Sequence, residues 1–187
     1  ADEIRNIENK IRFIVDPATL PTKGDGVLGW PLPMVSLISC WDRGDVSKNC
    51  VTQFFGYTDF AKAGGYGGNR GHNGVDFRAD IGTEIYAAEK GVVMAVGDTD
   101  VGCRGASYGK WVLLRHPNNL ATLYAHVSQI NVSANQELSR GHLIALSGKT
   151  GYATGPHLHF SVFVANAVRV ESIRSQVCGT LMTLPIS

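Results

Sequence analysis

The sequence PHLHFSV places His157 and His159 two positions apart in an apolar segment. Its aromatic and β-branched residues predict a strand, in which alternate side chains point to the same face. The two imidazoles then share one face and can reach a single metal-centred site, while Leu158, Phe160 and Val162 are expected to point into the core. Taken alone, such a pair also occurs by chance on surface strands.

The sequence GHNGVDF places His72 and Asp76 four positions apart. An imidazole nitrogen and a carboxylate oxygen are both suitable ligands for Zn²⁺. Gly71 and Gly74 disfavour a helix here, so we expect the two side chains to converge through a turn that enters a strand. The alternative is an aspartate that hydrogen-bonds within a turn beside an unrelated histidine.

A third histidine, His126, lies in the apolar sequence LYAHV. By itself, a histidine in an apolar strand is more often buried and structural than functional. His72, Asp76 and one strand histidine would supply three protein ligands and leave a fourth position for water, as catalytic zinc sites do. The remaining histidines could then act as general acid or base and stabilise a tetrahedral intermediate.

The other two histidines, His116 and His142, stand beside turn sequences. We interpret both as solvent-facing or structural.

Four cysteines are present, Cys40, Cys50, Cys103 and Cys178, and none forms a C-x-x-C pair. This pattern favours two disulfides formed in an oxidising compartment, with three possible connectivities. We prefer Cys40–Cys50, which closes a short polar loop, and by elimination Cys103–Cys178. The alternative is four reduced, buried cysteines that behave as small hydrophobes.

Composition limits the possible partners and locations. The chain has 187 residues, 44% hydrophobic residues and a formal net charge of +1, without a lysine or arginine cluster. We therefore expect no nucleic-acid partner, and no apolar run reaches the length of about 20 residues that a membrane span needs. Two disulfides would place the chain in an oxidising compartment, so we expect a monomer that is secreted, periplasmic or held in a cell envelope.

Many short strands are predicted between glycine-rich turns. They cover residues 51–55, 84–87, 91–96, 110–115, 121–126, 142–147 and 157–164, which argues for antiparallel sheets. Residues 168–184 could form a return strand or a short helix. The 22 glycines support the same mainly β interpretation.

The N-terminal part differs from the rest. Isoleucines spaced three and four apart predict a helix over residues 2–15, which either packs on its own domain or ends an upstream coiled coil. Prolines and glycines predict an irregular linker over residues 17–33. We therefore divide the chain into residues 1–33, helix and linker, and residues 34–187, one domain.

In its ordered motifs the chain resembles the lysostaphin-type zinc metallopeptidases, which include the LytM-like peptidoglycan endopeptidases. The resemblance covers roughly residues 65–163, about half of the chain. It rests on residues 71–77 (GHNGVDF), 82–83 (GT), 88–91 (AEKG), 123–126 (LYAH), 148–151 (GKTG) and 154–160 (TGPHLHF). The fold it implies has two mainly antiparallel sheets with a groove that holds a zinc site. Residues 38–56 and the tail from residue 165 onward lie outside the shared core and could shape one rim of this groove.

The resemblance also implies roles for particular residues. It makes His72, Asp76 and His159 the Zn²⁺ ligands, and it makes His126 and His157 the catalytic pair. Spacing alone does not tell His157 from His159. Some members also use a tyrosine before the first ligand to stabilise the oxyanion, and Tyr66 stands at that place.

The function that follows is a zinc-dependent endopeptidase that hydrolyses peptide cross-links or stem peptides of bacterial peptidoglycan. One alternative is a non-catalytic module of the same fold that binds the cell wall or activates an amidase. Such degenerate relatives usually lack a metal ligand, whereas this sequence lacks none. Another alternative is a polysaccharide-binding β domain with incidental histidines.

Overall fold

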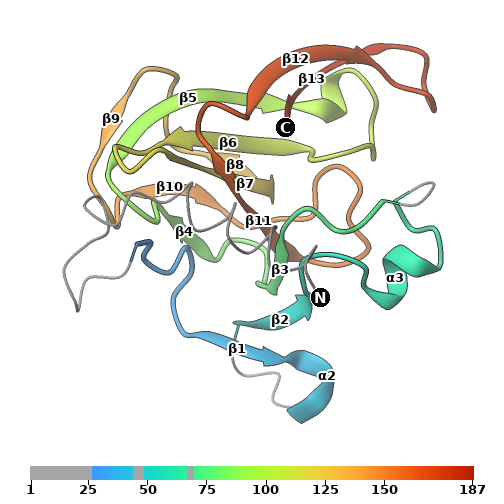
Figure 1. Cartoon of the computed structure of the whole chain (residues 1–187). Helices are drawn as coiled ribbons and strands as arrows, with labels where there is room; N and C mark the ends of the chain where they lie inside the picture. The colour runs from blue at the N-terminus through green and yellow to red at the C-terminus, as the bar shows by residue number, and fades with distance from the viewer. Residues whose placement is uncertain (1–26, 44–48, 67–69) are drawn as a thin grey trace, which may run out of the picture.

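The structure is a computed structural model that describes residues 27–43, 49–66 and 70–187 (Figure 1). The helix predicted over residues 2–15 and most of the predicted linker lie outside these residues. The division of the chain at residues 33 and 34 stays a prediction.

The largest sheet has eight strands in the order β1-β2-β3-β11-β7-β6-β5-β9. Their bounds are β1 (Val35–Ser39), β2 (Asn49–Gln53), β3 (Val75–Arg78), β5 (Gly91–Asp98), β6 (Lys110–Arg115), β7 (Leu120–Val127), β9 (Glu137–Leu138) and β11 (His157–Val164). All pairs in it are antiparallel except β1–β2, which is parallel. The expected antiparallel pairing is therefore confirmed for most of the sheet.

Two smaller sheets complete the β structure of the described residues. A three-stranded sheet has the order β4-β10-β8, formed by β4 (Glu84–Tyr86), β10 (Leu143–Leu146) and β8 (Gln129–Ile130). A two-stranded sheet pairs β12 (Arg169–Arg174) with β13 (Leu181–Ile186). Residues 168–184 therefore contain strands of a hairpin. Of the two alternatives that the sequence leaves open for this segment, the strand is correct and the helix is not. The mainly β prediction is confirmed.

The helices within residues 27–43, 49–66 and 70–187 are short. They are α2 (Cys40–Arg43), α3 (Asp59–Lys62) and the 3-10 turn η2 (Thr99–Val101). No helix in the described part of the chain has the length and apolar character that a membrane span requires.

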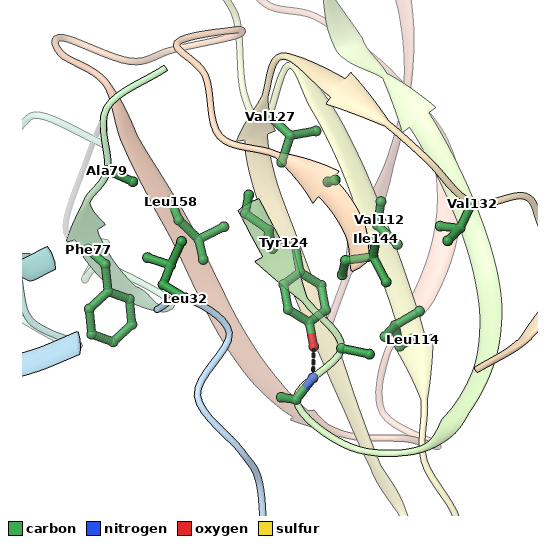
Figure 2. Packing of buried hydrophobic residues seen from close by; sticks show 14 of the residues in the cluster. Leu32, Phe77, Ala79, Val112, Leu114, Tyr124, Val127, Val132, Ile144 and Leu158 are labelled. Atoms are coloured by element: carbon green, nitrogen blue, oxygen red, sulfur yellow. Dashed lines mark hydrogen bonds between the residues drawn. The ribbon is translucent and has the colours of Figure 1, made fainter. Parts of the chain in front are cut away.

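The main core lies between the large sheet and the three-stranded sheet (Figure 2). Alternate residues of β6 enter two different clusters, because Val112 and Leu114 join this core while Trp111 and Leu113 join a second cluster on the opposite face. That second cluster is closed by residues that lead into β12, including Val168. Burial on both faces explains why β6 is a continuous apolar run rather than an alternating one.

One expectation about the core is wrong. Leu158 is buried and Phe160 packs against the main core, but the Val162 side chain is 45% exposed. β11 continues past the region that the main core covers, where Val162 pairs with Thr122. Period-two alternation correctly places Leu158, Phe160 and Val162 on one face of β11. It does not predict where along β11 the main core stops covering that face.

Both preferred disulfides are present. Cys40 is bonded to Cys50 and Cys103 to Cys178, with Cα–Cα distances of 5.1 and 5.7 Å. The first closes the segment between β1 and β2, and the second ties the β12–β13 hairpin to the turn that follows η2. The structure thus confirms the disulfide interpretation of the cysteines.

The end of the predicted linker is part of the domain. Leu32 is buried in the main core, and Leu28 packs against it. The Gly29 N–H donates a hydrogen bond to the Ala88 carbonyl at 2.6 Å. These contacts anchor the residues that precede β1 against the main core.

His116 is a structural histidine, as expected, and His142 is exposed. The His116 Nδ1 lies 2.9 Å from the Lys90 carbonyl and its Nε2 lies 2.8 Å from Thr122 Oγ1. Thr122 Oγ1 is in turn 3.0 Å from the Tyr124 hydroxyl, which accepts a hydrogen bond from the Ala88 N–H, drawn in Figure 2. This buried chain joins the turn before β5 to the centre of the large sheet.

We expect His116→Gln to lower the free energy of unfolding at pH 7 by about 1–3 kcal/mol, because it disrupts a buried hydrogen-bonded chain. Burial lowers the pKa of His116 below its ordinary value. The unfolded chain then binds the proton more readily, so this contribution to stability is lost as the pH falls below about 6.5. Urea unfolding at several pH values should show a smaller loss of stability on acidification for the variant than for the parent. Equal losses would contradict the role of His116.

Candidate metal centre

Sheet register brings two of the expected ligands together. Asp76 of β3 and His159 of β11 are directly opposed Cα partners, and His159 Nδ1 lies 2.9 Å from Asp76 Oδ1. His72 precedes β3 and is held by an isolated bridge to Gly56. Its Nε2 lies 3.1 Å from Asp76 Oδ1 and 3.0 Å from His159 Nδ1. The turn that enters β3 therefore places His72 and Asp76 as the sequence predicts.

The donor set of this cluster fits Zn²⁺. One ligand atom from each of His72, Asp76 and His159 lies within 4.8 Å of the others, and all three residues are buried. The second ring nitrogen of each histidine is already engaged, since His72 Nδ1 lies 2.9 Å from the Phe54 carbonyl and His159 Nε2 lies 2.8 Å from Ser161 Oγ. Such contacts fix the tautomer and leave the inward nitrogen free to bind metal.

Charge at the cluster is consistent with this fit. Burial would raise the pKa of Asp76, but hydrogen bonds to His159 and His72 outweigh it and hold that pKa well below its usual range. Burial lowers the pKa of His159. The cluster therefore presents a carboxylate and a neutral imidazole, which are the protonation states that metal binding needs.

Gly74 allows β3 and β11 to approach closely at this point. A Cβ at position 74 would lie 2.6 Å from both the Phe160 carbonyl oxygen and Ser161 Oγ, and 2.8 Å from His159 Cε1. Any larger residue would push into the His159 ring. This explains why glycine stands between His72 and Asp76.

His126 occupies a bulge in β7. The β6–β7 register shifts between Lys110 and Trp111, whose partners are Val127 and Ala125, so His126 is the extra residue. Its φ is +62°, in the left-handed region that is uncommon for non-glycine residues. Bulges often redirect a side chain near an active site, and strained backbone gathers at such places.

The bulge aims His126 at the other candidate catalytic histidine. The ring centroids of His126 and His157 are 4.6 Å apart, and those of His126 and His159 are 5.9 Å apart. His126 Nδ1 lies 2.8 Å from the Thr150 carbonyl, and His157 Nδ1 lies 2.8 Å from the Gly155 carbonyl. Each imidazole thus has its Nε2 available, and His157 Nε2 lies 3.7 Å from Asp76 Oδ2.

Burial lowers the pKa of His126 to about 3, with further lowering by His157 and His159. The imidazole is therefore neutral at pH 7. In that state its free Nε2 can accept a proton but cannot already carry one.

Tyr66 lies at the cluster. Its ring stacks on the His72 ring with a centroid distance of 5.4 Å and an interplanar angle of 7°. The Gln53 side-chain amide donates a hydrogen bond to the Tyr66 hydroxyl oxygen. The phenolic hydrogen is therefore free to donate, and burial raises the pKa of Tyr66, so the hydroxyl stays protonated.

Two further residues at the site were not found from the sequence. Gln53 Nε2 also donates to Asp76 Oδ2 at 3.2 Å, while its Oε1 accepts a hydrogen bond from Thr58 Oγ1 at 2.8 Å. Tyr108 lies with its ring 5.6 Å from that of His159, and its carbonyl accepts the His126 N–H at 2.9 Å. Neither residue type carries a sequence signal, because a glutamine or tyrosine acquires such a role only from its neighbours in space.

The cluster opens into a groove of about 750 Å³ whose lining includes Asp76 and His157. Most of the remaining lining residues come from β2, α2, α3 and the loop between β2 and α3. These elements lie on one side of β3 in Figure 1, away from the three-stranded sheet. A chain-like molecule that reaches the cluster can therefore continue along the protein surface.

Comparison with known proteins places this site in a family. The model of peptidase family M23 matches residues 70–171. The peptidoglycan DD-endopeptidase ShyA of Vibrio cholerae is 44% identical over 94 residues, which are 50% of this chain and 20% of that protein. The DD-carboxypeptidase/endopeptidase Mpg of Neisseria meningitidis is 40% identical over 89 residues, 48% of this chain and 19% of that protein. The matched stretch thus spans about a fifth of the length of these relatives.

Solved structures agree with this placement. A zinc-containing peptidase from Vibrio cholerae has a TM-score of 0.55 and 30% sequence identity, and covers 74% of this chain and 38% of its own. The catalytic domain of the M23 protein EnpA from Enterococcus faecalis has a TM-score of 0.51 and 25% identity, with coverages of 60% and 78%. The zinc expected from the sequence agrees with the first of these structures. Since the family model spans more than half of the 187 residues and contains all three residues of the metal cluster, the chain belongs to peptidase family M23.

Proposed function

We propose that the protein is a zinc-dependent endopeptidase that hydrolyses peptide cross-links or stem peptides of bacterial peptidoglycan. The supporting observation is the arrangement of five side chains. His72, Asp76 and His159 form a buried donor set, and His126 and His157 lie beside it with their rings 4.6 Å apart. A structural zinc site would need four protein ligands, whereas three leave a position open to substrate.

When bound, Zn²⁺ lowers the pKa of water towards about 7 and polarises a peptide carbonyl. In this proposal His72 Nε2, an Asp76 oxygen and His159 Nδ1 hold the ion. Either His126 or His157, each with a free Nε2, accepts the proton of the attacking water and later returns a proton to the leaving amine. The other imidazole stabilises the tetrahedral intermediate when its Nε2 also carries a proton, because its Nδ1–H is donated to a backbone carbonyl.

Tyr66 completes the proposed site as an oxyanion donor. Its hydroxyl oxygen is already bonded to the Gln53 amide, so the phenolic hydrogen is the part that can reach substrate. Its stacking on His72 keeps the ring beside the metal. Donors aimed at a developing negative charge stabilise the transition state more than the ground state.

The alternative is a binding or amidase-activating module without catalysis. The complete set of ligands and the two catalytic histidines favour an enzyme. Two disulfides support an oxidising location, which for this substrate is the cell envelope or the medium outside it.

The proposal is tested by incubating the zinc-loaded protein with purified sacculi and measuring newly released amino termini. We expect release by the zinc-loaded protein, loss of release after chelation, and recovery when zinc is restored. Mass analysis of the products identifies the bond that is cut. No release from several types of sacculi by protein with one bound zinc would refute the proposed activity.

We expect Gln53→Ala to reduce either zinc affinity or turnover by about 10–100-fold, because partners of metal ligands typically have effects of that size. The substitution frees one Asp76 oxygen and removes the partner of the Tyr66 hydroxyl. Zinc affinity by competition with a chromophoric chelator and kcat on a cross-linked peptide should be measured together. The matched control is Gln129→Ala, at an exposed glutamine of β8. Wild-type values for both quantities in Gln53→Ala would contradict this positioning role.

A further inference from the structure

Five aromatic side chains form much of the groove lining, which we call the aromatic wall. Trp41, Phe54, Phe55, Tyr57 and Phe60 all line it, and each has a large exposed surface. Trp41 is 82% exposed and Phe55 is 72% exposed. Soluble proteins seldom gather so many exposed aromatic rings unless the surface binds a partner.

The groove is continuous with the metal cluster, since Asp76 and His157 line the same space. A single molecule can therefore occupy the aromatic part and reach the metal cluster at the same time. The inference below rests on the proposed function, because it takes that molecule to be peptidoglycan.

The family model matches residues 70–171, whereas the aromatic wall is formed by residues 41–60, which precede that region. Trp41 directly follows Cys40, and the disulfide between Cys40 and Cys50 ties α2 to β2. The indole N–H of Trp41 donates to the Thr52 carbonyl at 3.4 Å. The Thr58 side chain caps α3, which carries Phe60. These contacts position Trp41 and the helix that carries Phe60, while Phe54, Phe55 and Tyr57 lie in the loop between β2 and α3.

The chemistry of the lining distinguishes the two parts of peptidoglycan. None of the described residues that line the groove is a lysine or arginine, and its two charged carboxylates are Asp59 and Asp76. Such a wall does not attract the carboxylates of stem peptides. Glycan strands instead consist of N-acetylated sugars with apolar ring faces that stack on aromatic side chains. The Ser39 hydroxyl accepts from the Trp41 N–H and the Thr52 hydroxyl donates to the Asp76 carbonyl, so each keeps a hydrogen-bonding position in the same lining that suits sugar hydroxyls and acetamido groups.

We propose that the aromatic groove is a saccharide subsite that binds the N-acetylated glycan strand of the substrate, with Trp41 as its main stacking residue. The subsite holds the strand to which a stem peptide is attached while that peptide reaches the metal cluster. Binding of sugar there needs neither zinc nor hydrolysis.

The test uses chitohexaose, an uncharged oligomer of N-acetylglucosamine that contains no peptide, in calorimetric titrations. We expect the parent protein to bind it and Trp41→Ala to weaken binding by about tenfold or more, as removal of a central aromatic residue commonly does. Trp30→Ala is the matched control, because Trp30 is 58% exposed but does not line the groove. Phe55→Ala is a second variant at an exposed position, and circular dichroism checks that every variant keeps the fold.

Absence of saccharide binding by the parent, or equal binding by parent and Trp41→Ala, would overturn the subsite. A parallel titration uses sugar-free, cross-linked stem-peptide dimers. If Trp41→Ala weakens binding of these dimers and leaves chitohexaose binding unchanged, the groove is a peptide subsite and the proposal is wrong. Failure of the zinc-loaded protein to hydrolyse sacculi would refute the proposed function alone, since chitohexaose binding is measured without turnover.

Discussion

His159→Ala is expected to abolish stoichiometric zinc binding and to reduce peptide hydrolysis to background. His159 Nδ1 and His72 Nε2 both lie within about hydrogen-bond distance of the same Asp76 oxygen, at 2.9 and 3.1 Å. Removal of one imidazole leaves two ligands, which cannot make the three-ligand site of a catalytic zinc. Metal content after dialysis, measured by atomic emission, should fall from one zinc per chain to none.

His142→Ala is the matched control, because His142 is exposed and lies outside the cluster. It should retain both zinc and hydrolysis. The ligand assignment would fail if His159→Ala kept one zinc of unchanged affinity. Thermal unfolding without metal separates loss of the site from loss of the fold.

His126→Asn is expected to keep zinc but to lower turnover by about 10²–10⁴-fold, the usual effect of losing an acid or base. Asparagine is the sharper substitution because it tolerates the left-handed backbone that His126 adopts, with φ of +62°. The bulge should therefore survive while the imidazole is lost. Zinc content and kcat on a cross-linked peptide measure the two effects separately.

His142→Asn serves as the control for the same chemical change at an exposed position. An unchanged kcat in His126→Asn would remove His126 from the mechanism. A simultaneous loss of zinc would instead show that its contribution is to the metal cluster.

The strands and the turn that brings His72 to Asp76 can be predicted from the sequence because both depend on local patterns. Alternation in PHLHFSV gives the face of His159, and the turn in GHNGVDF gives the convergence of His72 and Asp76. Sheet register then sets Asp76 directly opposite His159. The sequence by itself leaves the choice between His157 and His159 open, since both point from the same face of one strand.

Other features depend on neighbours that are distant along the chain. The left-handed conformation of His126 accompanies a register shift against β6, and no residue in LYAHV predicts that shift. Gln53 joins the site only because β2 pairs with β3, where Gln53 is the partner of Asp76. The exposure of Val162 likewise depends on where the core ends. The parallel pairing of β1 with β2 was not predicted, because glycine-bounded short strands favour antiparallel neighbours.

Asp76 and His159 are paired across β3 and β11, so the backbone ladder that builds the sheet also sets the spacing of two ligands. The fold itself therefore sets the distance between two of the three proposed ligands, in contrast to zinc fingers, whose ligands assemble only when the ion binds. If these residues hold zinc, we expect chelation and reloading to leave the sheet intact. The supply of metal in the surroundings, rather than the rate of folding, would then set the competent fraction of the molecules.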